Sequence, residues 1–162
     1  MTYPQWWERL VAALIDGIIL MIVGFIISAI LVSIAGFNVS MIRIMGLIAA
    51  LINTAIFVGY KVFFEAGQWQ ATPGKMVFGL KVVTESGGRA AQKEAFLRTW
   101  PWWLSLLSAL GALLLIGAWF NFLIFLLILA VFLTFFADPV GRCIHDQTAK
   151  MHVIKSGKGM IA

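Results

Sequence analysis

The stretch LVAALIDGIILMIVGFIISAILVSIA, residues 10–35, decides the fold of this chain. As a helix rising about 1.5 Å per residue it is about 39 Å long, which is enough to cross a hydrocarbon core of about 30 Å. Asp16 is the one charged residue within it. Because an ionised carboxylate inside a bilayer costs about 3 kcal/mol, Asp16 requires a partner, a proton or access to water.

The composition of the whole chain agrees with a membrane protein. Of its 162 residues, 62% are hydrophobic and 12% are charged, which leaves too little polar surface for a soluble domain. The net charge of +5 comes from basic residues beside apolar runs, where they suit anionic lipid headgroups. We therefore expect the lipid bilayer, and no nucleic acid, as a partner. The single cysteine, Cys143, excludes an internal disulfide.

Charged residues divide the chain into four expected spans, so the predicted fold class is an all-α membrane protein with a small cytoplasmic cap. One domain, residues 1–162, would contain spans at about residues 10–35, 44–64, 101–117 and 121–137, a loop over 65–98 and a tail over 138–162. Residues 37–40 are expected to form the first turn. Because residues 99–137 are uncharged and too long for one crossing, a second turn is expected at residues 117–121.

Basic residues test this topology. With four spans, all of the 12 lysines and arginines except Arg43 lie on the side of the termini and the central loop. Such residues concentrate on the cytoplasmic side of a membrane, so both termini are predicted to be cytoplasmic.

The central loop and the tail carry signals of local structure. Thr72-Pro73 is typical of a helix start, with Thr72 as the N-cap and proline at the first helical position. Leu80–Thr84 and Met151–Ile154 have strand character, and Glu85–Gly88 is typical of a turn. We expect the two strand segments to pair beneath the membrane and form the cap.

These motifs resemble the RDD family of bacterial membrane proteins. The resemblance rests on Arg9 and Asp16 in the first span, on Thr72-Pro73-Gly74-Lys75 and Gly79–Val83 in the loop, on Arg98, and on Arg142 to Asp146 in the tail. The arginine and two aspartates of the family name correspond to Arg9, Asp16 and Asp146. The family usually has glycine and threonine after Ala149, where this chain has Lys150-Met151. The resemblance implies a multi-pass protein of the bacterial cytoplasmic membrane and solute transport, with cation/proton exchange among the proposed activities.

The partner of Asp16 decides between two interpretations of that residue. Arg9 lies seven residues earlier on nearly the same helical face, about 10 Å away along the axis. We favour Arg98 as the partner, because a guanidinium binds a carboxylate in a bidentate fork and keeps its charge when buried; Lys61 is the other candidate. Asp16 is then either half of a structural ion pair or a site that exchanges a proton for a cation. Only the second interpretation requires access to water.

Other residues are assigned supporting roles. Ala13 with Gly17, and Gly24 with Ser28, form ridges of small residues for packing within the fold or at a homodimer seam. Asn53 and Thr54 are expected to form interhelical hydrogen bonds, or to help coordinate a cation near Asp16.

The tail contains Cys143, His145, Asp146 and His152, whose spacing fits no standard zinc pattern, so no metal site and no cofactor is expected. Asp146 is expected to tie the tail to Arg142 or to Lys75. No nucleophile has a base and an orienting group nearby in sequence, so no enzyme activity is expected.

The leading functional hypothesis is transport of a small cation or solute, with a monovalent cation and a proton as candidate ligands. Four helices in one protomer hardly enclose a pathway, so a homo-oligomer is expected. The alternative is a non-transporting scaffold or assembly factor whose basic cap binds lipid or a partner protein.

Overall fold

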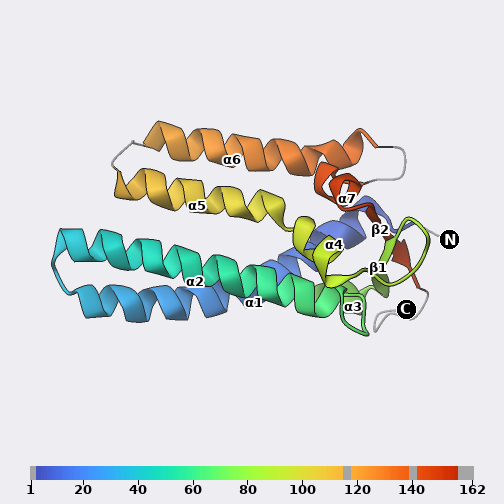
Figure 1. Cartoon of the computed structure of the whole chain (residues 1–162), viewed down its shortest axis with the longest axis horizontal. Helices are drawn as coiled ribbons and strands as arrows, with labels where there is room; N and C mark the ends of the chain where they lie inside the picture. The colour runs from blue at the N-terminus through green and yellow to red at the C-terminus, as the bar shows by residue number, and fades with distance from the viewer. Residues whose placement is uncertain (1–2, 115–117, 139–141, 157–162) are drawn as a thin grey trace.

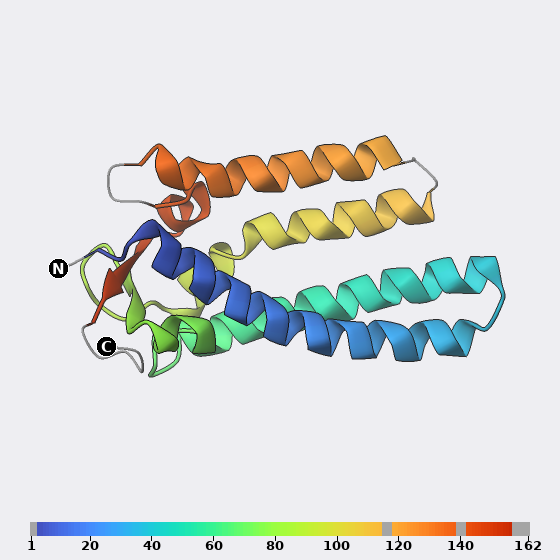
Figure 2. The same cartoon turned by 180° about the vertical axis from the view of Figure 1, so that it is seen from behind.

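Two helical hairpins and a small cap make up the fold (Figure 1). The computed structural model describes residues 3–114, 118–138 and 142–156. The first hairpin consists of α1 (Trp6–Ala35) and α2 (Val39–Glu65). The second consists of α5 (Trp100–Leu113) and α6 (Ala118–Leu133), which a short 3-10 helix, η1 (Thr134–Phe136), extends. Seen from behind, α1 crosses α2 as it approaches the cap (Figure 2).

Local capping explains where the first hairpin begins and turns. The Gln5 amide donates to Glu8 Oε2 at 2.8 Å, so α1 starts at Trp6, before the expected residue 10. α1 ends at Ala35, before Gly36 with its φ of 57°. Asn38 then accepts a hydrogen bond from the Met41 amide at 3.0 Å and caps α2. The predicted turn at residues 37–40 is therefore placed too late, because α2 already begins at Val39.

Within the described residues, three helices are long and apolar enough to cross a membrane: Trp6–Ala35, Val39–Glu65 and Trp119–Phe136. α5 has 14 residues and spans about 21 Å, less than a hydrocarbon core of about 30 Å. The second predicted turn is partly wrong, because α6 starts at Ala118 and includes Asn121; Gly117 lies outside the described residues. Ser108 Oγ donates to Asn121 Oδ1 at 2.6 Å and ties α5 to α6.

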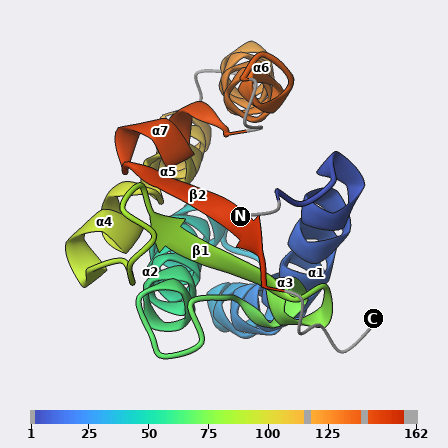
Figure 3. The ribbon, with the colours of Figure 1, turned by 90° about the vertical axis from the view of Figure 1, so that its right-hand side faces the viewer.

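The short elements gather at one end of the hairpins (Figures 1 and 3). They are α3 (Pro73–Val77), β1 (Leu80–Thr84), α4 (Gln92–Leu97), α7 (Ile144–Thr148) and β2 (Met151–Lys155). β1 and β2 pair antiparallel, with Leu80 opposite Lys155 and Thr84 opposite Met151. This pairing confirms the prediction made for the two strand segments, and the helix start at Thr72-Pro73 is confirmed as well.

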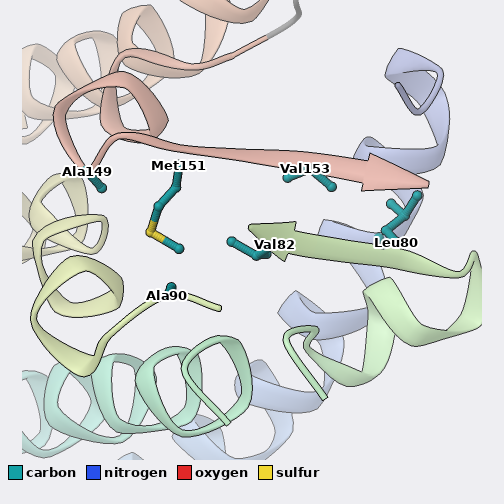
Figure 4. Close-up of a cluster of buried hydrophobic side chains, with 7 residues drawn as sticks. Leu80, Val82, Ala90, Ala149, Met151 and Val153 are labelled. Carbon is teal, nitrogen blue, oxygen red and sulfur yellow. The ribbon is translucent and has the colours of Figure 1, made fainter. Parts of the chain in front are cut away.

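A small apolar core holds the cap together (Figure 4). Its members are buried side chains from both strands and the segments beside them: Ala12, Leu80, Val82, Ala90, Ala149, Met151 and Val153. Ala12 belongs to α1, so the same core fastens the cap to the first hairpin. Lys150, which precedes β2, has a φ of 51°, a left-handed conformation that favours glycine.

Candidate functional site

A cavity of about 140 Å³, called the polar cavity here for the charged groups in its mostly apolar wall, lies where the helices meet the cap. Its walls come from α1, α2, α5, α6, α7 and the residues that follow α4. Six polar or charged side chains line it: Asp16, Lys61, Glu65, Arg98, Thr99 and His145. The remaining lining residues are small or aromatic, and they include Ala13 and Gly17 of α1.

Asp16 is 3% exposed and receives its hydrogen bonds from neutral groups. Tyr60 of α2 donates its hydroxyl to Oδ1 at 2.7 Å, the Gly74 amide donates to the same oxygen at 2.8 Å, and the Thr72 hydroxyl donates to Oδ2. The carboxylate therefore fastens α3 to both helices of the first hairpin. A Cβ at Gly74 would lie 2.1 Å from the Ala12 carbonyl oxygen, so this close approach requires glycine.

The predicted pairing of Asp16 with Arg98 is wrong. Within the described residues, no ion pair joins Asp16 to a lysine, an arginine or a histidine. Arg98 instead donates from Nε to Asp146 Oδ1 at 2.5 Å and from Nη1 to Glu65 Oε2 at 2.8 Å. Because two other carboxylates satisfy the guanidinium, hydroxyl and amide donors take its place around Asp16.

A buried ion-pair network lies beside Asp16 and is centred on Glu65 and Asp146, which are 1% and 0% exposed. Arg98 bridges these two carboxylates. Arg9 Nη2 lies 2.7 Å from Asp146 Oδ2, and Lys75 Nζ lies 2.6 Å from Glu65 Oε1. The Glu65–Asp146 network thus connects four helices, α1, α2, α3 and α7. Arg98, which joins its two carboxylates, is the C-cap residue of α4.

Burial and neighbouring charges shift the pKa values of the groups of the site that lie outside the spanning helices. Burial alone would raise the pKa of Asp146, but Arg98 and Arg9 hold it well below its usual range. Burial and the nearby Arg98 lower the pKa of Lys75 to about 7, although Glu65 opposes this shift. Burial also lowers the pKa of His145 to about 4 against the opposing effect of Asp146, so His145 is neutral at pH 7.

The expected ties of Asp146 to Arg142 or Lys75 are also wrong. Arg142 Nε lies 3.2 Å from Asp138 Oδ2, four residues earlier, and Arg142 Nη1 lies 3.5 Å from Glu85. Lys75 contacts Glu65 instead. Asp146 lies in the first turn of α7, and its two oxygens accept hydrogen bonds from Arg9 and Arg98 instead.

Cys143, His145 and Asp146 lie close together, with one potential ligand atom of each within 4.8 Å of the others. Their chemistry does not suit a metal ion. Both Asp146 oxygens accept from guanidinium groups, and burial and the Asp146 charge raise the pKa of Cys143 to about 11. The thiol is therefore protonated at neutral pH in this structure.

The supporting residues on the first two helices do not all lie at the polar cavity. Asn53 Nδ2 donates to Ser28 Oγ at 3.2 Å, which confirms an interhelical hydrogen bond; both residues line a separate groove with Gly24. Asn53 and Thr54 are not among the residues that line the polar cavity. Gly24 packs against Asn53, but a Cβ at Gly17 would have no atom within 4 Å, so Gly17 faces open space rather than a tight contact.

Sequence analysis missed the roles of Glu65, Tyr60 and Thr72. Glu65 directly follows the expected span at residues 44–64, and the sequence alone assigns it no role in the site. The missed signal was a cation and an acid one helical turn apart, Lys61 and Glu65, at the end of an apolar helix. Thr72 was expected to cap α3, but its hydroxyl donates to Asp16 and makes no cap hydrogen bond.

The RDD family model matches residues 3–150, so the chain belongs to the RDD family. Membership and the apolar helices together identify it as an integral membrane protein. No curated protein and no solved structure matches the chain.

Proposed function

We propose that this RDD protein is a small transporter of the bacterial cytoplasmic membrane that exchanges a monovalent cation for a proton at Asp16. One observation carries the proposal: a buried carboxylate, whose hydrogen-bond donors among the described residues are all neutral, lines the polar cavity of about 140 Å³. A water molecule takes about 30 Å³ of liquid volume, so such a cavity has room for a small ion with part of its hydration shell.

The carboxylates of the site differ in how their charge is balanced. Glu65 and Asp146 each have two cationic side chains within 3 Å, whereas no ion pair of Asp16 exists within the described residues. The charge of Asp16 is therefore the one left for a proton or an incoming cation. Oxygen atoms from a carboxylate and hydroxyl groups are suitable ligands for hard cations, and Tyr60 and Thr72 supply the hydroxyls.

The proposal includes four crossings, with α5 as the third, and a cytoplasmic cap with both termini. The positive-inside rule supports this orientation, because Arg43 is the one basic residue expected on the far side. A pathway enclosed by two hairpins is narrow, so we propose a homo-oligomer in lipid as the transporting form.

The second candidate is a scaffold or assembly factor that does not transport. The Glu65–Asp146 network favours this candidate, because buried charges that are fully paired can have a purely structural role. That role is to fix how the helices and the cap pack together. In that case the basic cap would bind anionic lipid or a partner protein.

Proteoliposomes loaded with a pH-sensitive dye separate the two functions. We expect added sodium or potassium chloride to change internal pH with the wild type, and Asp16→Asn to abolish the response. Asp138→Asn is the matched control, because Asp138 pairs with Arg142 and is not among the residues lining the polar cavity.

Asp16→Asn puts an NH₂ group among three hydrogen-bond donors, which can destabilise the fold. Size-exclusion chromatography therefore checks that the variant is folded. Tyr60→Phe keeps the carboxylate and removes one donor, and we expect it to change the apparent cation affinity of exchange. A folded Asp16→Asn protein with full exchange, or a silent wild type, would support the scaffold instead.

A further inference from the structure

Lys61 is the loosely held cation of the polar cavity. Its Nζ lies 3.9 Å from Glu65 Oε1 and 5.7 Å from the centre of the Phe57 ring. The two oxygens of Glu65 are already occupied by Lys75 at 2.6 Å and Arg98 at 2.8 Å. Within the described part of the chain, the Lys61 ammonium donates no hydrogen bond, and 3.9 Å is its shortest contact with a carboxylate. Its side chain lines the same cavity as Asp16.

We propose that the Lys61 ammonium is a built-in competitor, which occupies the polar cavity until an incoming monovalent cation displaces it. This inference rests on the proposed cation site at Asp16 and assigns to Lys61 the control of cation affinity.

Charge balance supports the assignment. The charged side chains that line the cavity are two cations, Lys61 and Arg98, and two carboxylates, Asp16 and Glu65. These charges balance while Asp16 is ionised, so a further cation would leave the cavity net positive, and like charges a few ångströms apart repel by several kcal/mol at the dielectric of a partly buried site. A cation that binds to ionised Asp16 is therefore favoured when one resident cation moves away.

Side-chain exposure and ion-pair distances indicate which cation moves. The Arg98 side chain is 7% exposed and bridges two carboxylates, and Lys75 holds a short contact with Glu65. The Lys61 side chain is 18% exposed, and a lysine can move its ammonium toward water while its aliphatic stem stays on apolar surface. Displacement of Lys61 consequently breaks no short ion pair.

Equilibrium dialysis with ²²Na⁺ on purified protein in detergent tests the inference. We expect Lys61→Met, which keeps the length of the stem and removes the charge, to bind sodium at least tenfold more tightly than the wild type. Lys61→Arg should bind no more tightly than the wild type. Lys81→Met is the matched control, since Lys81 is exposed on β1 and should leave affinity unchanged.

The double variant Asp16→Asn/Lys61→Met locates the effect, because the gain should vanish when the carboxylate is lost. Sodium binding by the wild type with unchanged or weaker binding by Lys61→Met would overturn the role of Lys61 and leave the proposed exchange standing. Absence of binding by both proteins would overturn the proposed function and the inference together.

Discussion

Asp146 is a fully buried carboxylate that contacts two guanidinium groups. Replacing it with asparagine leaves Arg9 and Arg98 without the counter-charge that offsets their desolvation, and loss of one partner from a buried ion pair costs about 3–5 kcal/mol. We therefore expect Asp146→Asn to unfold at a markedly lower temperature than the wild type in detergent. Glu85→Gln is the control, because the exposed contact of Glu85 with Arg142 at 3.5 Å should contribute about 0–1 kcal/mol.

His145 makes the stability of the protein depend on pH. Its pKa is about 4 in the folded protein and about 6.5 in an unfolded chain. Between these values the unfolded state binds more protons, so stability should fall as pH is lowered from 6.5 to 4, by about 2–3 kcal/mol. Thermal unfolding across this range measures the effect. His145→Gln should have a flatter profile, and an unchanged slope in that variant would contradict the assignment.

Lys150 occupies a left-handed position with a φ of 51°. A residue with a Cβ pays about 1–2 kcal/mol there, and glycine avoids this cost while losing more entropy on folding. We expect Lys150→Gly to stabilise the protein by about 0.5–1 kcal/mol, measured as a rise in unfolding temperature. A lower unfolding temperature would show that the Lys150 side chain contributes more than its backbone strain costs.

At the scale of elements, the docking of α3 on α1 depends on Gly74. A Cβ at this position would lie 2.1 Å from the Ala12 carbonyl oxygen and 3.0 Å from Asp16 Cγ. Gly74→Ala should therefore displace α3, weaken the hydrogen bonds to Asp16 and destabilise the protein by about 2–3 kcal/mol. Gly59→Ala is the matched control on α2, since its Cβ would meet no atom within 4 Å and it should be neutral or slightly stabilising.

The elements were predictable from sequence where the signal is local. Thr72-Pro73 predicted the start of α3, and alternating apolar residues predicted that Leu80–Thr84 pairs with the tail. The partners of Asp16 were not predictable in this way. Charge complementarity favoured Arg98, but which donors reach Asp16 depends on how closely α3 approaches α1, and that distance is set by the missing side chain of Gly74.

At the scale of the whole molecule, the polar cavity lies where the hairpins and the cap meet. Asp16 fastens α1 to α2 and α3, while Asp146 fastens α1 to α7 through Arg9. Arg98 connects the two sets of contacts, because it bonds both Glu65 of α2 and Asp146 of α7. Movement of one hairpin relative to the other would therefore change the surroundings of Asp16, which the proposed transport would require.

The path of the chain requires α5 to cross the membrane if α6 does. α4 belongs to the cap, and α6 runs back to the cap from the far end of the hairpins (Figure 1), so the segment between them has to reach that far end. The 14 residues of α5 are short for the bilayer, and local thinning accommodates such a mismatch at modest cost. We therefore expect residues 40 and 118 on one side of the membrane and residue 86 on the other.

Labelling with a membrane-impermeant maleimide tests this topology in a Cys143→Ser background, because Cys143 is the single cysteine. Ser40→Cys and Ala118→Cys should react in intact cells with a permeabilised outer membrane, and Ser86→Cys only in inside-out vesicles. Reaction of Ala118→Cys together with Ser86→Cys would mean that α5 does not cross. The cap and the far end of α5 would then share one side, and the proposed pathway between two spanning hairpins would be excluded.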